Sequence, residues 1–122
     1  MSCLPPDLAD ATAAAIAAAV AEGTVSAREV AEAALARTDA RAPTLNAFTD
    51  ITRGRALAEA DAIDARRRGG APMGPLAGVP FAVKNLFDLQ GLTTRAGSRL
   101  RMRAPPAERD ARLVERLSAA GA

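Results

Sequence analysis

Apolar residues recur at helical spacing in the first part of the chain. Residues 10 to 22 place alanine, isoleucine and valine on one face, and Gly23 follows where a helix-ending glycine would lie. Ser26 and Glu29 have the spacing of a capping box, which predicts a second helix running to about Arg41. The side chains predicted to face inward in that helix are Val30, Ala33, Ala34 and Thr38.

A third helix is predicted over residues 53 to 70. Leu57, Ala60 and Ile63 are three positions apart, so they lie on one face. Three arginines, residues 66 to 68, occupy the end where the helix dipole is negative.

The pattern then changes from helical to extended. Residues 45 to 51, LNAFTDI, are a short strand candidate, and the glycines and prolines of residues 69 to 78 predict a loop. Residues 79 to 87 are almost continuously apolar, as in a strand covered on both faces by helices. Residues 91 to 109 have the composition of a long irregular connection.

A last helix is predicted over residues 111 to 122, with Asp110 as its cap. Its apolar stripe consists of Leu113, Val114 and Leu117. A strand followed by a packed helix calls for another strand beside the first, usually parallel, but none follows before Ala122.

We therefore expect an α/β fold in which N-terminal helices precede the start of a mixed, helix-covered sheet that is truncated. The chain has 122 residues, and 32 of them are alanine, so large apolar side chains for a core are scarce. Residues 1–122 are expected to be the incomplete N-terminal portion of a single domain.

Net charge and cysteine content exclude only a few classes of function. The formal net charge is +2, and the basic stretches at 65–70 and 95–103 contain no aromatic rings that could stack on bases, so we expect no direct nucleic-acid binding. Cys3 is the only cysteine and cannot form an internal disulfide, which fits the cytoplasm. The alanine-rich residues 11–20 follow two aspartates and are too short to span a bilayer, so no membrane association is expected.

Lys84 is the most informative single residue. It is the only lysine, the other fifteen cationic residues being arginine, and it lies within the apolar run of 79–87. Burial in a covered strand would favour its neutral amine, a proton acceptor, whereas arginine stays protonated. Such a lysine is a candidate general base. The structural alternative is an ammonium that reaches water at a strand end or pairs with Asp88.

The segment from Gly74 to Ser98, GPLAGVPFAVKNLFDLQGLTTRAGS, closely resembles the first motif block of the amidase signature family. In that family, G-P-L-x-G-[VI]-P leads into a strand with a lysine, and T-x-x-G-S follows. A weaker pattern of flanking helices matches from about Asp10 onward. The motif residues present here are Gly74, Pro75, Leu76, Gly78, Val79, Pro80, Lys84, Gly97 and Ser98.

The resemblance implies a Ser, cis-Ser, Lys triad that hydrolyses a small-molecule amide without a metal or other cofactor. Lys84 would take a proton from a bridging serine, which activates the nucleophilic serine. Both serines of the family lie in a Gly/Ser-rich block, and no G-G-S-S-G-G occurs in this sequence. The 122 residues are therefore expected to carry the base without the nucleophile.

The branch of the family is indicated by LAGVPFAVKNLFD, which looks most like the 1-carboxybiuret hydrolases, enzymes that release ammonia from a small ureido substrate. Asn85 replaces the commoner aspartate, and Ala77 stands where many members have histidine. The next resemblances are to the glutamine-hydrolysing component of the amidotransferase for misacylated tRNA and to general amidases. The resemblance is compatible with a homo-oligomer or with a small partner subunit. A non-catalytic interaction domain is the alternative from another class.

Five other residues of this segment have structural interpretations. Gly78 and Pro80 are expected to shape the turn that enters the strand. Asp88 is expected to cap or orient the following loop rather than touch substrate. Gly97 and Ser98 either border the mouth of an active site or form a plain turn.

Overall fold

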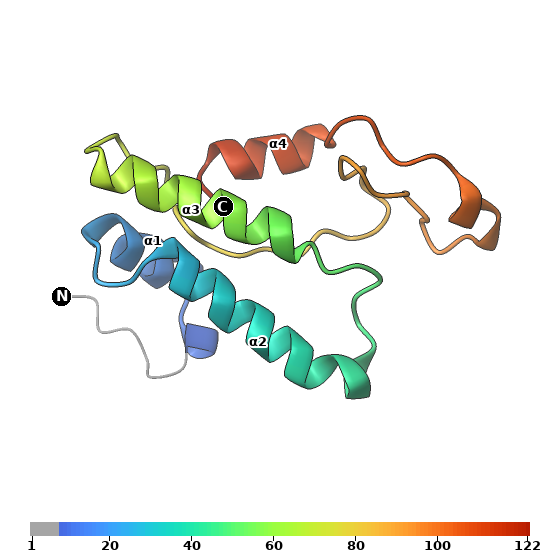
Figure 1. Ribbon diagram of the computed structural model, residues 1–122, viewed down its shortest axis with the longest axis horizontal. Coiled ribbons are helices and arrows are strands. Elements are labelled where there is room, and N and C mark those ends of the chain that lie inside the picture. Colours follow the sequence, from blue (N-terminus) through green and yellow to red (C-terminus); the bar gives the residue numbers. More distant parts are fainter. Residues whose placement is uncertain (1–7) are drawn as a thin grey trace. The chain divides into compact units, whose positions relative to one another are not determined.

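The computed structural model describes residues 8–122, which contain four α-helices and two short 3-10 helices. The α-helices are α1 (Ala13–Glu22), α2 (Ala27–Leu45), α3 (Arg53–Arg68) and α4 (Arg112–Ala119) (Figure 1). The 3-10 helices are η1 (Leu8–Asp10) and η2 (Arg99–Arg103). These residues divide into a first unit, 8–80 with 120–122, and a second unit, 81–119. Cys3 lies outside the described residues.

Helix α1 has well-defined ends. The Thr12 hydroxyl oxygen accepts a hydrogen bond from the Ala15 amide at 3.2 Å, so α1 begins later than the predicted residue 10. Gly23 ends the helix at φ +79°, a left-handed conformation that glycine adopts without a steric penalty. The predicted glycine cap is therefore confirmed.

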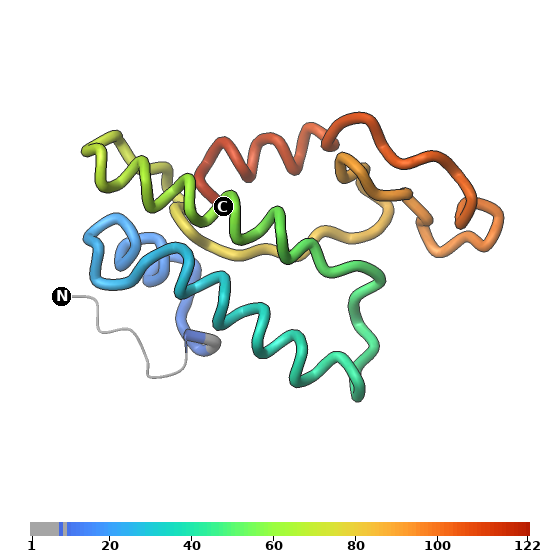
Figure 2. Tube along the Cα trace, viewed as in Figure 1, coloured from blue at the N-terminus to red at the C-terminus, as the bar shows by residue number. Residues whose placement is uncertain are grey.

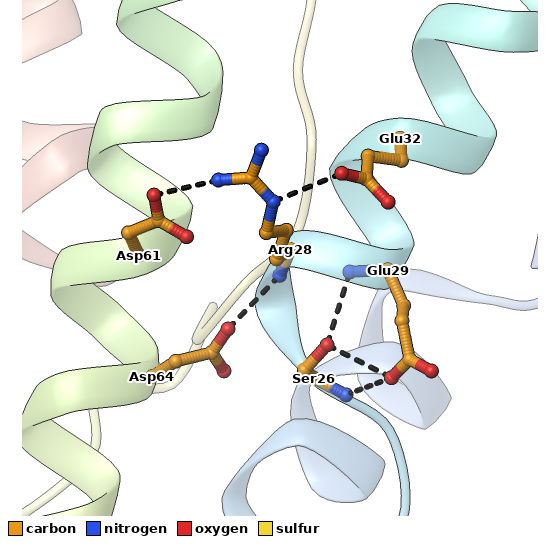
Figure 3. Close-up of polar contacts among 6 residues, drawn as sticks. All are labelled: Ser26, Arg28, Glu29, Glu32, Asp61 and Asp64. Atoms are coloured by element: carbon orange, nitrogen blue, oxygen red, sulfur yellow. Dashed lines mark hydrogen bonds and ion pairs between the residues drawn. The ribbon is translucent and has the colours of Figure 1, made fainter.

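The N-terminus of α2 has a hydrogen-bond partner for each of its first four amides, and Figure 3 shows those of Ser26, Arg28 and Glu29. The predicted capping box is confirmed: the Ser26 amide donates to Glu29 Oε2 at 2.8 Å, and the Glu29 amide donates to Ser26 Oγ at 3.1 Å. The Ala27 and Arg28 amides donate to the Asp64 carboxylate at 2.8 and 3.1 Å. Asp64 is only 4 % exposed and comes from α3, so it joins the two helices.

Charges flank this capped end. The Arg28 guanidinium donates to Asp61 Oδ2 at 2.7 Å and to Glu32 Oε1 at 2.9 Å, as Figure 3 shows. The hydrogen bond to Asp61, followed by that to Glu32, raises the pKa of Arg28 above its ordinary value. Hydrogen bonds from the backbone and side chain of Ser26 lower the pKa of Glu29.

Helix α2 continues past the predicted end at Arg41. Pro43 lies inside its last turn, and Asn46, at φ +47°, ends it by donating its amide hydrogen to the Ala42 carbonyl at 2.9 Å. Asparagine tolerates this left-handed conformation better than most residues. The helix thereby includes Leu45, the first residue of the predicted strand at 45 to 51.

The apolar core of the first unit is made of small side chains. Helices α2 and α3 lie side by side (Figure 1) and supply three of its six buried members, and α1 supplies two. Its buried members are Ile16, Val20, Ala27, Val30, Ala60 and Ala77. The other residues predicted to face inward, Ala33, Ala34, Thr38, Leu57 and Ile63, are half-buried.

The predicted sheet does not form in residues 8–122. The backbone has no strand at 45 to 51 or at 79 to 87, and the single strand-like pairing is an isolated parallel bridge between Gln90 and Ala107. An extended segment becomes a strand only when its N–H and C=O groups pair with a neighbouring strand. No such neighbour runs beside residues 79 to 87 in this part of the chain.

The second unit is largely irregular. Figure 2 traces its chain through turns and η2 before it enters α4. Helix α4 confirms the predicted last helix, and Val114 is 1 % exposed while Leu113 is 50 % exposed. Adjacent helical residues point about 100° apart, so one short helix buries only part of the predicted stripe. No helix of residues 8–122 combines the length and apolarity that crossing a bilayer demands.

Candidate functional site

The first half of the motif block is held by close backbone contacts within the first unit. The Leu76 amide donates to the Ala120 carbonyl at 2.9 Å, and the Gly78 amide donates to the Gly121 carbonyl at 2.8 Å. A Cβ atom at Gly74 would overlap the Ala120 carbonyl oxygen. Gly74 is therefore required for packing, because only glycine lets the two backbone segments approach this closely.

Gly78 ends the turn that precedes the lysine segment, as expected. It has φ +72°, and a Cβ atom there would lie 2.9 Å from Val20 Cγ2 and 3.1 Å from Ala27 Cβ. The neighbouring Ala77 is fully buried, so a larger side chain would have to displace its surroundings. The alanine at a position where many amidases have histidine therefore fits tight packing in this chain.

Lys84 lies at the end of the extended segment that follows, in the second unit. Its side chain is exposed, and its carbonyl accepts a hydrogen bond from the Phe87 amide at 3.0 Å. The expectation of a buried lysine is therefore wrong for this chain. Burial was inferred from a strand covered on both faces, and no sheet is present in residues 8–122 to provide that cover.

Asp88 does not pair with Lys84. Its Oδ1 accepts a hydrogen bond from the Thr94 hydroxyl at 2.5 Å, and its carbonyl accepts one from the Ala111 amide at 2.9 Å, just before α4. The Thr94 carbonyl in turn accepts from Arg101 Nε at 2.8 Å. Asp88 therefore orients the loop after it, as expected, and the Lys84 ammonium has no carboxylate partner among the described residues.

Asn85, next to the lysine, binds the second half of the motif block. Its side-chain Oδ1 accepts hydrogen bonds from the Arg95 amide at 2.6 Å and the Ala96 amide at 3.2 Å. Its backbone carbonyl accepts a further bond from the Ala96 amide at 2.8 Å. Together with the bond between Asp88 and Thr94, Asn85 thus joins the lysine segment to the T-x-x-G-S segment.

The segment that Asn85 holds is a tight turn ending at Ser98. The Ser98 amide donates to the Arg95 carbonyl at 2.8 Å, and Ala96 and Gly97 have φ values of +48° and +70°. Two successive positive φ values with this hydrogen bond define a type I′ turn. Ser98 precedes η2, and its hydroxyl makes no capping hydrogen bond there. The two interpretations of Gly97 and Ser98 are compatible, because this turn lies beside the lysine segment.

The resulting candidate site consists of residues 84–88 and 94–98. It offers one amine, one carboxylate and two hydroxyl-bearing side chains, but no hydroxyl is hydrogen-bonded to Lys84 within the described residues. The same part of the chain holds no group of three potential metal ligands. The arrangement therefore places an amine, a carboxylate and hydroxyls on two segments that hydrogen bonds join.

Sequence reasoning did not foresee that Asn85 joins the two segments. Its only signal was the residue type, because asparagine and aspartate readily accept hydrogen bonds from backbone amides in loops. The capping role of the buried Asp64 was also missed, since a single carboxylate on a helix is usually a solvated surface residue.

Comparisons with known proteins agree with the motif. A family model described as Amidase matches residues 29–122. AtzE of Pseudomonas sp. (strain ADP), which is one of the subunits of a 1-carboxybiuret hydrolase, is 57% identical over 103 residues, which are 84% of this chain and 22% of that protein. The GatA-type chain of the glutamyl-tRNA(Gln) amidotransferase of Chloroflexus aurantiacus is 46% identical over 105 residues, 86% of this chain and 21% of that protein.

The fold is shared as well. A solved structure described as a vestigial protein complex that reveals the evolutionary origins of an s-triazine catabolic enzyme matches with a TM-score of 0.85 and 56% identity. That match covers 87% of this chain and 23% of the solved chain. The present chain thus spans about a fifth of the length of the curated relatives it matches.

Proposed function

This chain belongs to the amidase family, and we propose that it is the N-terminal portion of an amide hydrolase whose general base is Lys84. The observation that carries the proposal is the 57% identity with AtzE of a 1-carboxybiuret hydrolase, which extends over most of the chain. The chemistry of Lys84 supports it, because a chain that otherwise uses only arginine has one lysine, at the motif position.

In this proposal, Lys84 accepts a proton from a bridging serine, which then activates the nucleophilic serine. The nucleophile attacks the amide carbonyl, ammonia leaves, and water releases the acid from the acyl-enzyme. Both serines come from residues outside the present 122. Those residues also have to cover Lys84, which is exposed here, because a lysine acts as a base only when its neutral form is populated.

We favour a small ureido or amide substrate such as 1-carboxybiuret, on the strength of the higher of the two identities. The second candidate is the GatA-type component of an amidotransferase for misacylated tRNA, which the 46% identity supports. A small partner subunit fits both alternatives, since AtzE is named as part of a larger enzyme and the matching solved structure as a complex. We expect a cytoplasmic enzyme. Ammonia release from 1-carboxybiuret, compared with release from glutamine, distinguishes the two substrates.

The Lys84→Arg substitution tests the role of the lysine in the complete enzyme. Arginine keeps the charge but accepts no proton at working pH, so kcat/KM should fall by about 100- to 10,000-fold, as in Lys84→Ala. Circular dichroism checks that both variants are folded. Near wild-type turnover by Lys84→Arg would contradict the assignment of Lys84 as the general base. The 122-residue chain alone should release no ammonia, because it lacks the nucleophile.

A further inference from the structure

We propose that Asn85 is a positioning residue for Lys84, an inference that rests on the proposed function. Its side-chain carbonyl ties the lysine segment to the turn of residues 95–98 and so fixes the backbone from which the lysine extends. Asn85 does not itself act on substrate in this account.

The hydrogen bonds of Asn85 are unusually concentrated. One side-chain oxygen accepts from two successive amides, those of Arg95 and Ala96, and the Asn85 carbonyl accepts again from Ala96. Two of the three bonds are shorter than 2.9 Å. Because one oxygen accepts from two neighbouring amides, both the distance and the direction of the turn relative to Asn85 are fixed.

The bound turn has a conformation that needs support. Ala96 lies at φ +48°, where its Cβ atom crowds the following carbonyl, and Gly97 follows at φ +70°. Residues held in such conformations persist only where the surroundings determine them, and they are common at functional sites. The hydrogen bonds that Asn85 accepts from the Arg95 and Ala96 amides hold the first half of this turn in its conformation.

The consequence for Lys84 follows from its place in the chain. Its carbonyl is bound by the Phe87 amide, and the next residue is held by the turn of 95–98. The ammonium lies at the end of a flexible four-carbon stem. Because the stem is flexible, only a fixed backbone gives the amine a reproducible origin from which it reaches a serine.

The test compares Asn85→Ala with Asn85→Asp in the complete enzyme. Alanine removes the acceptor, so kcat should fall by about 10- to 100-fold while KM stays within about threefold, as expected for a misplaced catalytic group. Aspartate keeps an acceptor oxygen in the same place and should retain kcat within about threefold. Gln90→Ala, an exposed amide in the same loop whose side chain makes no hydrogen bond to the described residues, is the matched control and should behave like wild type.

Two activity results would overturn the inference. Full activity of Asn85→Ala would show that the lysine needs no such support, and equal impairment of Asn85→Asp and Asn85→Ala would show that the acceptor oxygen is not what matters. If Asn85→Ala does not fold, Asn85→Ser, whose side chain is too short to span both amides, takes its place. The rate of amide hydrogen exchange in residues 94–98 should rise in Asn85→Ala and in Asn85→Ser. An unchanged rate also contradicts the proposal.

The Lys84→Arg variant, assayed in parallel, separates this inference from the proposed function. An inactive Lys84→Arg beside an active Asn85→Ala overturns the positioning role alone. An active Lys84→Arg overturns the general base and, with it, anything that Asn85 would position.

Discussion

The first unit of the protein is held together by packed helices, and the second largely by hydrogen bonds that polar side chains accept across irregular segments. In the first, α2 and α3 pack around an apolar core, and the buried Asp64 of α3 caps α2. In the second, Asn85 and Asp110 accept hydrogen bonds from backbone amides 10 and 20 positions away, and Asp88 accepts one from the Thr94 hydroxyl. Large apolar side chains exposed in the second unit are Phe81, Leu86, Phe87, Leu100, Met102 and Leu113.

This difference divides the residues of the sequence motif between the two units. The motif residues at 74–78 belong to the first unit and serve close packing, whereas Lys84, Gly97 and Ser98 belong to the second. Loops held by a few specific hydrogen bonds can be positioned accurately without a core of their own. The first half of the motif therefore serves packing, and the second half contains Lys84, the residue proposed to act as the base.

The largest effect on stability is expected from Asp64→Ala. Its removal leaves the buried Ala27 amide and the part-buried Arg28 amide without acceptors, which should lower the free energy of unfolding by about 2–4 kcal/mol. Asp61→Ala on the same helix breaks an exposed ion pair with Arg28 and should cost much less, because solvent screens exposed charges. Urea denaturation followed by circular dichroism measures both. Equal losses for the two variants would contradict a special role for the buried carboxylate.

A second test compares glycines that share a positive φ but differ in surroundings. Gly78→Ala in the first unit meets Val20 and Ala27, so backbone strain and overpacking together should cost about 2–4 kcal/mol. Gly91→Ala in the second unit, at φ +84°, meets nothing within 4 Å and should cost only the strain of about 1–2 kcal/mol. Thermal denaturation of both variants gives the difference. A larger loss at Gly91 would reverse the proposed contrast between the units.

The smallest effect concerns the pH dependence of the α2 capping box. Hydrogen bonds from Ser26 lower the pKa of Glu29 below its ordinary value of 4.5. A group with a depressed pKa in the folded state contributes stability above its unfolded value, and this contribution is lost as pH falls through the folded value. Acidification below about pH 4.5 should therefore loosen the start of α2, and Glu29→Gln should remove that component. Amide exchange at residues 26–29 as a function of pH reports it, and an identical pH profile in both proteins would refute it.

Local sequence predicted the helices well, because their signals lie within a few residues. The glycine at position 23, the capping box of Ser26 and Glu29, and the spacing of Leu57, Ala60 and Ile63 each act inside one element. The motif from Gly74 to Ser98 likewise indicated the family, which the comparisons confirmed. The general-base role of Lys84 stays a prediction.

Contacts between distant residues were decided only by the tertiary structure. Asp64 reaches amides more than thirty positions away, and Asn85 reaches Arg95 and Ala96 across a loop. The apolar run at 79 to 87 has the composition of a strand but forms none in residues 8–122, which leaves Lys84 exposed. The physical reason is the same in each case. A helix completes its hydrogen bonds within its own segment, whereas a strand, a buried carboxylate or a loop asparagine is defined by partners that its local sequence does not contain.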